Sequence, residues 1–172
     1  MEEKISVLIS NEELQKRIKE LAKQIDKDYE GKSIHLICIL KGSVFFTCAL
    51  AEQLTLPVTM DFIQVSSYGS GTDSSGKIQI KKDLEESIEG RDVLVIEDII
   101  DSGNTLSYLL PELKKRKPAS ICLCTLLDKP ERRTADVTVE YTGFEVPDKF
   151  VVGFGLDYAQ KYRNLPYVGY IG

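Results

Sequence analysis

The hydrophobic residues follow two alternating patterns along the chain, which predicts strands and helices in turn. Residues 34–40, 92–97 and 119–127 are short, almost continuously apolar runs, typical of strands that are buried on both faces. Residues 44–54 and 106–115 read as helices that follow the first two of these runs. Strands that alternate with helices predict one α/β domain over residues 1–172, with a central parallel sheet flanked by helices.

Weaker patterns add further elements on either side. Ser10 and Glu13 have the spacing of a capping box, and the apolar residues after them recur at helical intervals: Leu14, Ile18, Leu21 and Ile25. Residues 58–66 and 78–82 read as strands, the second on an exposed edge. Beyond Asp128 the chain reads as irregular, with short strands near 137–141 and 150–155.

Composition and charge exclude several classes of protein. The 172 residues are 42% hydrophobic and 28% charged, which is ordinary for a globular chain, and the net charge of -5 argues against a general nucleic-acid binder. No apolar run is long enough to cross a membrane, and no signal peptide is recognised. The four cysteines lie within apolar runs, so we expect buried, reduced thiols and a cytoplasmic location: Cys38, Cys48, Cys122 and Cys124.

Candidate chemistry gathers where the run 92–97 ends. Glu97 and Asp98 follow apolar residues, and Asp101 opens a short stretch of small polar residues before a helix. Ligands of open parallel sheets bind beyond the carboxyl ends of the strands, and a helix N-terminus favours a phosphate there. Carboxylates beside such a phosphate site suit a sugar, because they accept hydrogen bonds from vicinal hydroxyls. The alternative is a solvated acidic turn with a helix cap at Asp101.

The segment VLVIEDIIDSGNT, residues 93–105, resembles the phosphoribosyl-diphosphate signature of the type I phosphoribosyltransferase family, in the form of its hypoxanthine-guanine branch. Four further stretches match the family in order: LKGS (40–43), SSYG (66–69), LLDKPERR (126–133) and VPDKFVVGFGLDYAQKYRNLPYVG (146–169). The resemblance covers nearly the whole chain. It implies the type I fold, with a small hood formed by the chain-terminal segments over the central sheet.

The resemblance also implies site residues. Those expected to hold the phosphoribosyl group and its 5′-phosphate are Glu97, Asp98, Asp101, Ser102, Gly103, Asn104 and Thr105. Asp101 is the expected general base, acting on the proton at N7 of the purine. Those expected to bind diphosphate are Lys41, Gly42, Ser67, Tyr68 and Arg163. In the family the peptide that matches Leu40–Lys41 can be cis.

Purine recognition is implied for four residues: Lys129, Phe150, Val151 and Asp157. Lys129 would donate to the exocyclic oxygen at position 6, Phe150 would stack on the base, and the backbone of Val151 would bind the base. A Mg²⁺ ion is the implied cofactor, with Glu97, Asp98 and Asp157 as the acids near it. The implied partners are a purine base and phosphoribosyl diphosphate, with no nucleic acid or membrane, in a homodimer or homotetramer.

Residues 67–77 are almost all small and polar, which predicts a mobile loop, and the resemblance implies a lid over the active site. Gly71–Lys77 nearly matches a phosphate-binding P-loop, but Ile78 stands where that motif requires Ser or Thr. His35, the sole histidine, lies inside a strand and is expected to be structural. Two other functions stay open: a non-catalytic sensor of phosphoribosyl diphosphate, and a transferase that prefers xanthine.

Overall fold

The computed structural model describes residues 3–68 and 77–172 of the chain. Two sheets organise the described part: a six-stranded sheet in the order β4-β3-β2-β5-β6-β7 and a three-stranded sheet in the order β1-β9-β8. The elements, in chain order, are β1 (Ile5–Ile9), α1 (Asn11–Asp28), β2 (Ile34–Ile39), α2 (Val44–Gln53), β3 (Val58–Tyr68), β4 (Lys77–Lys82), β5 (Asp92–Ile100), α3 (Asn104–Lys114), β6 (Ser120–Asp128), the 3₁₀ turn η1 (Pro130–Arg132), β7 (Tyr141–Glu145), β8 (Phe150–Val152) and β9 (Val168–Ile171).

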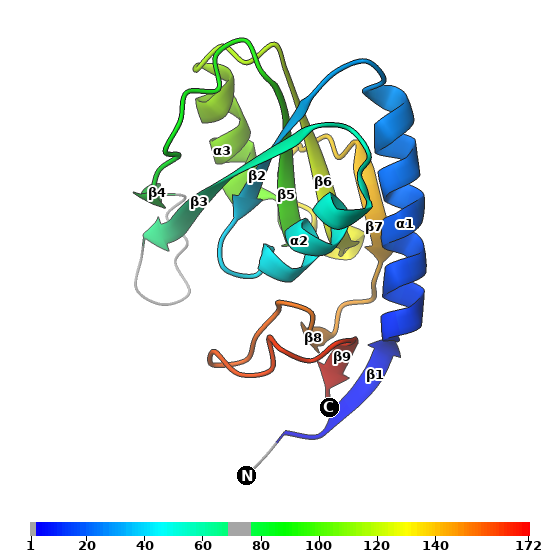
Figure 1. Ribbon diagram of the computed structural model, residues 1–172. Coiled ribbons are helices and arrows are strands. Elements are labelled where there is room, and N and C mark those ends of the chain that lie inside the picture. Colours follow the sequence, from blue (N-terminus) through cyan, green and yellow to red (C-terminus); the bar gives the residue numbers. More distant parts are fainter. Residues whose placement is uncertain (1–2, 69–76) are drawn as a thin grey trace.

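The large sheet is parallel from β3 to β7, and β4 joins its edge antiparallel to β3. Helices α1 and α2 cover one face and α3 covers the other (Figure 1). Successive residues of β5 serve the two faces in turn: Leu94 and Ile96 pack towards α1 and α2, whereas Val93 and Val95 pack towards α3. This double burial explains why the strand sequences are apolar throughout, and the predicted α/β fold is confirmed.

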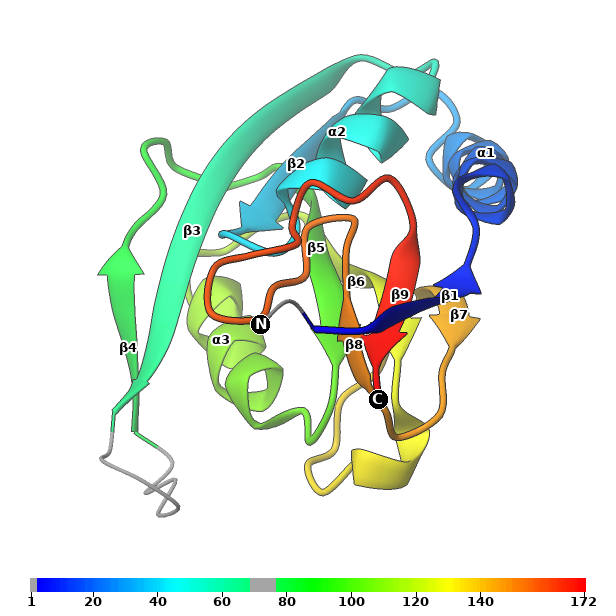
Figure 2. The ribbon, with the colours of Figure 1, turned by 90° about the horizontal axis from the view of Figure 1, so that it is seen from below.

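The small sheet lies beyond the carboxyl ends of the parallel strands (Figures 1 and 2). β1 pairs antiparallel with β9, so that Ile5 lies opposite Ile171, and β9 pairs with β8. The predicted hood of chain-terminal segments is therefore present. Its apolar side closes on the core, because Val151, Leu156 and Val168 belong to the same buried cluster as α1 and α2.

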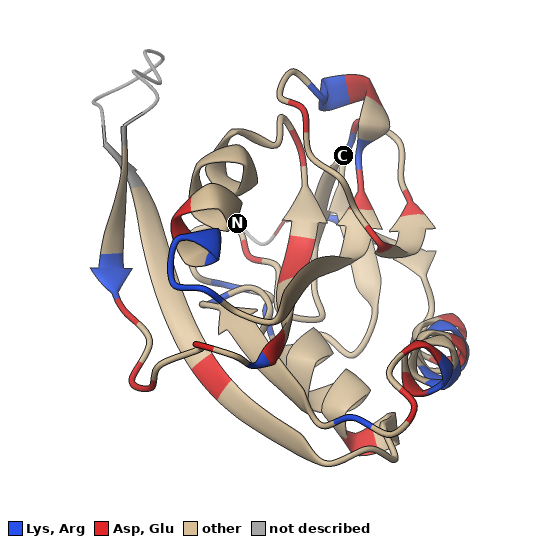
Figure 3. Ribbon diagram, turned by 90° about the horizontal axis from the view of Figure 1, so that it is seen from above, with Lys and Arg blue, Asp and Glu red and all other residues tan. Residues whose placement is uncertain are grey.

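Helix α1 begins where the sequence predicted. The Ser10 hydroxyl accepts a hydrogen bond from the Glu13 amide, and the Glu13 carboxylate accepts one from the Ser10 amide, each at 3.1 Å. The apolar residues of α1 are buried, while charged residues of both signs interleave along its solvent side (Figure 3). No helix in residues 3–68 or 77–172 is long and apolar enough to cross a membrane.

Several element predictions need correction. β5 continues to Ile100, so Glu97 and Asp98 lie within the strand and not at its end. β7 is Tyr141–Glu145, whereas a strand was predicted near 137–141, and β8 stops at Val152 because Gly153 turns with a φ of +96°. The pairing of β1 with β9 was not predicted at all.

Both ends of the segment predicted as a loop, 67–77, belong to strands. The backbone of Ser67 and Tyr68 belongs to β3, and that of Lys77 belongs to β4. Residues 69–76, and with them most of the near P-loop motif, lie outside the described residues. Ile78 continues a strand where a P-loop would open a helix, which agrees with the rejection of that motif.

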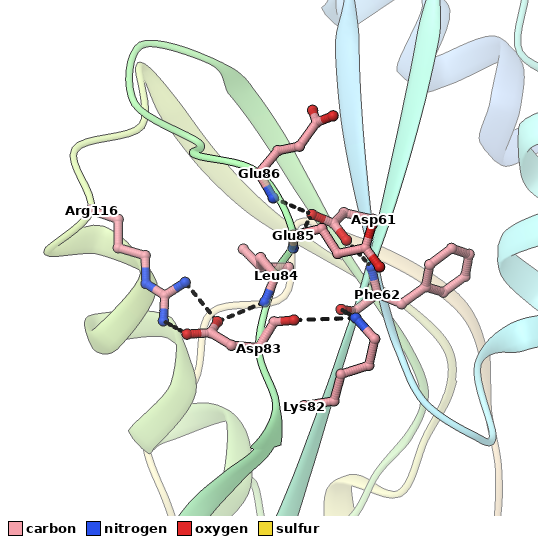
Figure 4. Close-up of polar contacts among 8 residues, drawn as sticks. All are labelled: Asp61, Phe62, Lys82, Asp83, Leu84, Glu85, Glu86 and Arg116. Carbon is pink, nitrogen blue, oxygen red and sulfur yellow. Dashed lines mark hydrogen bonds and ion pairs between the residues drawn. The ribbon is translucent and has the colours of Figure 1, made fainter.

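A polar cluster anchors the base of the β3–β4 hairpin (Figure 4). The buried Asp61 carboxylate accepts hydrogen bonds from the amides of Glu85 and Glu86, at 2.9 and 3.1 Å. Next to it, Asp83 accepts two hydrogen bonds from the Arg116 guanidinium at 2.7 and 2.9 Å, which lowers the pKa of Asp83. These contacts tie the segment after β4 to β3 and to the end of α3.

The cysteine prediction was correct for two of four residues. All four thiols are free, and Cys38 and Cys124 are buried, but Cys48 is exposed on α2 and Cys122 is half-buried. Burial raises the pKa of Cys38 to about 11, so that thiol stays protonated at neutral pH.

His35 is buried at the amino end of β2, far from the predicted site residues. Its Nδ1 lies 2.7 Å from the Thr59 hydroxyl, which also accepts from Arg91 at 2.7 Å. Beside that bond the Thr59 hydroxyl keeps its hydrogen and a second lone pair, so it can pair with Nδ1 in either neutral tautomer. Nε2 is buried with no hydrogen-bond partner among residues 3–68 and 77–172. Burial, and then the charge of Arg91, lower the pKa of His35 below its ordinary value of 6.5.

We expect this histidine to make folding sensitive to mild acid. The unfolded chain binds a proton at His35 before the folded chain does, so the stabilisation is complete above pH 6.5 and declines as the pH falls through the folded pKa. The limiting slope is about 1.4 kcal/mol per pH unit. Urea unfolding of the wild type and His35→Asn at pH 7.5 and 5.5 measures it. Equal pH dependence in the two proteins would contradict the prediction.

Candidate active site

The predicted phosphate loop lies between β5 and α3. Asp101 and Ser102 follow β5, and Gly103 precedes the first residue of α3 with a φ of +84°. A Cβ on Gly103 would meet Val137 Cγ2 at 3.1 Å and Arg133 Cδ at 3.2 Å, so the backbone conformation favours glycine and the space for a side chain is tight. The loop surrounds a hollow of about 210 Å³ that is lined by Glu97, Ile99, Ile100, Asp101, Ser102, Gly103, Asn104, Thr105 and Leu106. The positive end of the α3 dipole would favour an anion in this hollow.

The loop is supported from behind by residues for which sequence analysis proposed no role. The Ser102 carbonyl accepts hydrogen bonds from the amides of Thr134 and Ala135, both at 3.0 Å. Arg133 donates through Nε to the Asp101 carbonyl at 3.2 Å, and its guanidinium also pairs with Asp128. The backbone of the loop is thus held before any ligand binds. Arg133 lies in the LLDKPERR stretch, but nothing in its spacing indicated this contact.

Glu97 and Asp98 are adjacent acids near the end of β5, of which Glu97 is buried and Asp98 is half-buried. The Glu97 carboxylate accepts from the Ser43 hydroxyl at 3.4 Å and from the Asp98 amide at 3.0 Å. Burial, reinforced by the charge of Asp98, raises the pKa of Glu97 well above its usual range, and burial also raises the pKa of Asp98. Such carboxylates gain most from ligands that bring hydroxyl donors or positive charge.

The Lys41–Gly42 turn packs directly against this acid pair. The Leu40–Lys41 peptide is cis, which the sequence alone could not decide. A Cβ on Gly42 would overlap the Asp98 carboxylate, and a Cβ on Gly155 would overlap the Gly42 carbonyl oxygen. The two glycines therefore allow β5, the turn after β2, and the loop after β8 to stack at the same edge of the sheet.

A second, larger hollow adjoins the phosphate loop. Its volume is about 530 Å³, and it is lined by Asp98, Ile99, Asp101, Lys129, Arg132, Asp148, Lys149, Phe150, Val151, Leu156 and Asp157. The Lys129 ammonium lies 3.8 Å from Asp101 and 4.0 Å from Asp148, on a side chain that is 11% exposed. Phe150 is 52% exposed and packs edge-on against Tyr158, with 5.5 Å between the ring centroids. An aromatic face, an ammonium and backbone groups thus surround a space wide enough for a flat base.

The two hollows share Ile99 and Asp101. Asp101 therefore stands at the junction of the phosphate loop and the hollow that contains Lys129. Its side chain is half-exposed, so a ligand that spans both hollows would contact it.

The third group of predicted residues lies on the loop after β8. Asp157 is 3.5 Å from the Arg163 guanidinium, which donates to the Gly155 carbonyl at 2.7 Å. Gln160, which sequence analysis did not identify, accepts from Arg163 Nη2 at 3.1 Å and from Lys41 Nζ at 3.3 Å. Lys41 and Arg163, predicted as diphosphate ligands from distant parts of the chain, are thereby brought together. The side chains of Ser67 and Tyr68, the other two predicted diphosphate ligands, lie outside the described part of the structure.

The predicted metal residues do not form a preassembled site. No group of three or more Asp, Glu, His or Cys side chains that could hold a metal ion occurs in residues 3–68 and 77–172. Asp157 instead contacts Arg163 and accepts from the Gln160 amide at 2.9 Å. One or two carboxylates are nevertheless what Mg²⁺ takes from a protein when phosphates and water complete its shell. Glu97 and Asp98, adjacent acids on β5, offer oxygen ligands of that kind.

Residues 8–159 match the family described as phosphoribosyl transferase domain. With the parallel sheet and the loop after β5, this match shows that the chain belongs to the phosphoribosyltransferase family. Among curated relatives, the hypoxanthine-guanine phosphoribosyltransferase of Bacillus subtilis (strain 168) is 54% identical over 163 residues, which cover 95% of this chain and 91% of the relative.

A crystal structure of a hypoxanthine-guanine phosphoribosyltransferase from Bacillus anthracis superposes with a TM-score of 0.94. It is 50% identical and covers 99% of this chain and 100% of that one. The bifunctional protein TilS/HprT of Listeria monocytogenes is 55% identical over 163 residues, but the chain spans only 25% of that longer protein.

Proposed function

We propose that this chain transfers the 5-phosphoribosyl group of phosphoribosyl diphosphate to N9 of hypoxanthine or guanine. The products are the purine nucleoside monophosphate, IMP or GMP, and diphosphate, which is the chemistry of purine salvage. One observation carries the proposal: the hollow lined by the loop between β5 and α3 (the phosphate hollow) meets the hollow that contains Lys129 at Asp101. A nucleoside monophosphate has a phosphate at one end and a base at the other, so it fits two hollows joined in this way.

Asp101 is the proposed general base. It stands where the sugar would join the base, and its carboxylate lies 3.8 Å from the Lys129 ammonium. We assign it the proton at N7 of the purine, which it would hold or remove as the bond to N9 forms. Glu97 and Asp98 would accept hydrogen bonds from the ribose hydroxyls, and the 5′-phosphate would bind the loop 101–105 at the start of α3.

Lys129 is the proposed determinant of base choice. Its ammonium has only donors, so it binds the oxygen at position 6 of hypoxanthine or guanine and rejects the amino group of adenine. Phe150 would stack on the base, the backbone of Val151 would hydrogen-bond to it, and the backbone of Asp157 would lie near position 2. The Phe150 ring is exposed enough to contact a ligand, and the Tyr158 ring packs against it at nearly a right angle.

Diphosphate is the leaving group, and charge grows on it as the C1–O bond breaks. Lys41 and Arg163 would stabilise that charge, together with the Gly42 backbone and residues Ser67 and Tyr68. Glu97, Asp98 and Asp157 would hold a Mg²⁺ ion, which when bound supplies positive charge beside the ribose hydroxyls and the diphosphate.

The alternative functions receive no support from the relatives. Relatives with about half of their residues identical include proteins named hypoxanthine or hypoxanthine-guanine phosphoribosyltransferase. The homodimer or homotetramer, the single domain over residues 1–172, and the cytoplasmic location stay predictions.

A competition among four bases tests the proposal. Purified protein with Mg²⁺ and phosphoribosyl diphosphate is offered hypoxanthine, guanine, xanthine and adenine, and the nucleotide and diphosphate formed are both measured. We expect product from hypoxanthine or guanine, in equal amounts with diphosphate, and little from adenine. Xanthine as the preferred base would support the second alternative, and binding of phosphoribosyl diphosphate without product from any base would support the sensor.

A further inference from the structure

Gln160 lies between the two cations that are proposed to bind diphosphate. Its side-chain oxygen Oε1 accepts a hydrogen bond from Lys41 Nζ at 3.3 Å and another from Arg163 Nη2 at 3.1 Å. Lys41 comes from the turn after β2, and Arg163 from the loop after β8. One neutral oxygen thus holds together two like charges that come from distant parts of the chain.

The position of Gln160 is fixed by the loop that carries it. The backbone amide of Gln160 donates to the Asp157 carboxylate at 2.9 Å. Tyr158 and Lys161, on either side of Gln160, exchange two backbone hydrogen bonds. Its φ of +69° is in the left-handed region that few residues other than glycine adopt, and Ala159 and Tyr162 share this conformation. The backbone conformation therefore directs the Gln160 side chain back towards Lys41 and Arg163.

The chemistry of an amide suits this place better than that of a carboxylate. An amide oxygen accepts from both cations without neutralising them, so both keep their full charge for an incoming anion. A carboxylate would form stronger, charge-assisted hydrogen bonds with the same two groups, and the anion would have to displace it. Asp157 already lies 3.5 Å from Arg163, so a second acid would leave this cation strongly engaged.

We propose that Gln160 is a positioning residue for the diphosphate group. Its Oε1 holds Lys41 and Arg163 together in the ligand-free protein, and a diphosphate oxygen replaces it between them when the substrate binds. The geometry is thus set before binding, which reduces the ordering that the ligand must impose. This inference rests on the proposed function, because it takes Lys41 and Arg163 to be the diphosphate ligands.

Two substitutions at Gln160 test separately the effect of a negative charge and the effect of a shorter side chain. Gln160→Glu keeps the shape and adds a negative charge, so we expect the Kd of inorganic diphosphate and the KM of phosphoribosyl diphosphate to rise about tenfold. Gln160→Asn keeps the amide and tolerates the positive φ, but it is one methylene shorter and loses the bridge, so we expect a rise of about threefold. For both variants kcat and the KM of the purine should stay within about twofold of the wild type. Gln24→Glu adds the same charge on the exposed side of α1 and should leave every constant unchanged.

Isothermal titration with inorganic diphosphate, with and without Mg²⁺, gives a readout that does not depend on turnover. Wild-type affinity in both variants would overturn the role of Gln160 and leave the proposed function intact. Tighter binding of diphosphate by Gln160→Asn would also overturn the role of Gln160. The Gln160 side chain would then compete with diphosphate for the two cations and would not position them. A wild-type protein that neither binds diphosphate nor forms nucleotide would overturn both the inference and the proposed function.

Discussion

Asp101→Asn should lower turnover by about 10²–10⁴-fold and leave the KM of phosphoribosyl diphosphate within about threefold. The asparagine side chain has the same shape as aspartate and can still accept a hydrogen bond. It cannot remove the proton from N7 of the purine. The phosphate loop should remain in place, because its backbone is held by Arg133 Nε on the Asp101 carbonyl and by two amides on the Ser102 carbonyl. Steady-state kinetics with hypoxanthine varied at saturating phosphoribosyl diphosphate measure the effect.

Asp148→Asn is a matched control for this substitution. Asp148 lies 4.0 Å from the Lys129 ammonium, and Asp101 lies 3.8 Å from it, so each change removes one carboxylate charge near Lys129. Asp148 does not line the phosphate hollow, and we expect its replacement to lower turnover less than tenfold. Similar losses of turnover in the two variants would mean that the negative charge beside Lys129 causes the effect and that Asp101 is not the general base.

Gly155→Ala should destabilise the protein by at least about 2 kcal/mol and raise the KM of phosphoribosyl diphosphate. The new methyl group would overlap the Gly42 carbonyl oxygen, and the φ of +104° is unfavourable for alanine. The Gly155 amide also donates to the Arg163 carbonyl at 2.9 Å, so a shift of Gly155 moves the loop that carries Arg163 and Asp157.

Gly31→Ala separates the two contributions in this prediction. Gly31 has a φ of +80°, but nothing lies within 4 Å of an added Cβ, so this variant reports the backbone penalty alone, about 1 kcal/mol. Thermal unfolding and the KM of each variant are compared with those of the wild type. Equal destabilisation by the two variants, with an unchanged KM for Gly155→Ala, would show that the stacking on Gly42 does not support the site.

The sequence predicted the large sheet well because its strands are buried on both faces, which leaves continuous apolar runs such as that in β2. The predicted end of β5, at residue 97, was wrong for a physical reason. Its pairing with β6 continues past the apolar run, so that Glu97 lies opposite Thr125 and Ile100 lies opposite Asp128. Pairing with a neighbouring strand, and not hydrophobicity, decides where such a strand stops.

The hood shows a second limit of predicting strands from the hydrophobic pattern of each segment alone. β1 and β9 are only five and four residues long and come from opposite ends of the chain, so neither segment shows its partner in its own sequence. The resemblance to a family predicted the hood, while the hydrophobic pattern did not. Val137 and Val139 read as a strand but pack against the α3 side of the core without belonging to one, because β6 pairs further along, with Tyr141 opposite Cys124.

Site residues could be proposed from the sequence where a residue's chemistry coincides with a family motif, as at Asp101 and Lys129, and their roles stay predictions. Arg133 and Gln160 were missed because each acts through another part of the chain: Arg133 through the Asp101 carbonyl, and Gln160 through Lys41 and Arg163. Arg133 is 32 residues from Asp101, and Gln160 is 119 residues from Lys41, so neither contact follows a short spacing in the sequence that could indicate it.

A crystal structure with bound IMP tests the central claim most directly. We predict the 5′-phosphate on the loop 101–105 at the start of α3, the base beside Phe150, and the oxygen at position 6 within hydrogen-bonding distance of Lys129 Nζ. Asp101 should lie next to the sugar–base junction, where the two hollows meet. A nucleotide bound with its phosphate away from this loop, or with its base outside the hollow of Lys129 and Phe150, would contradict the account.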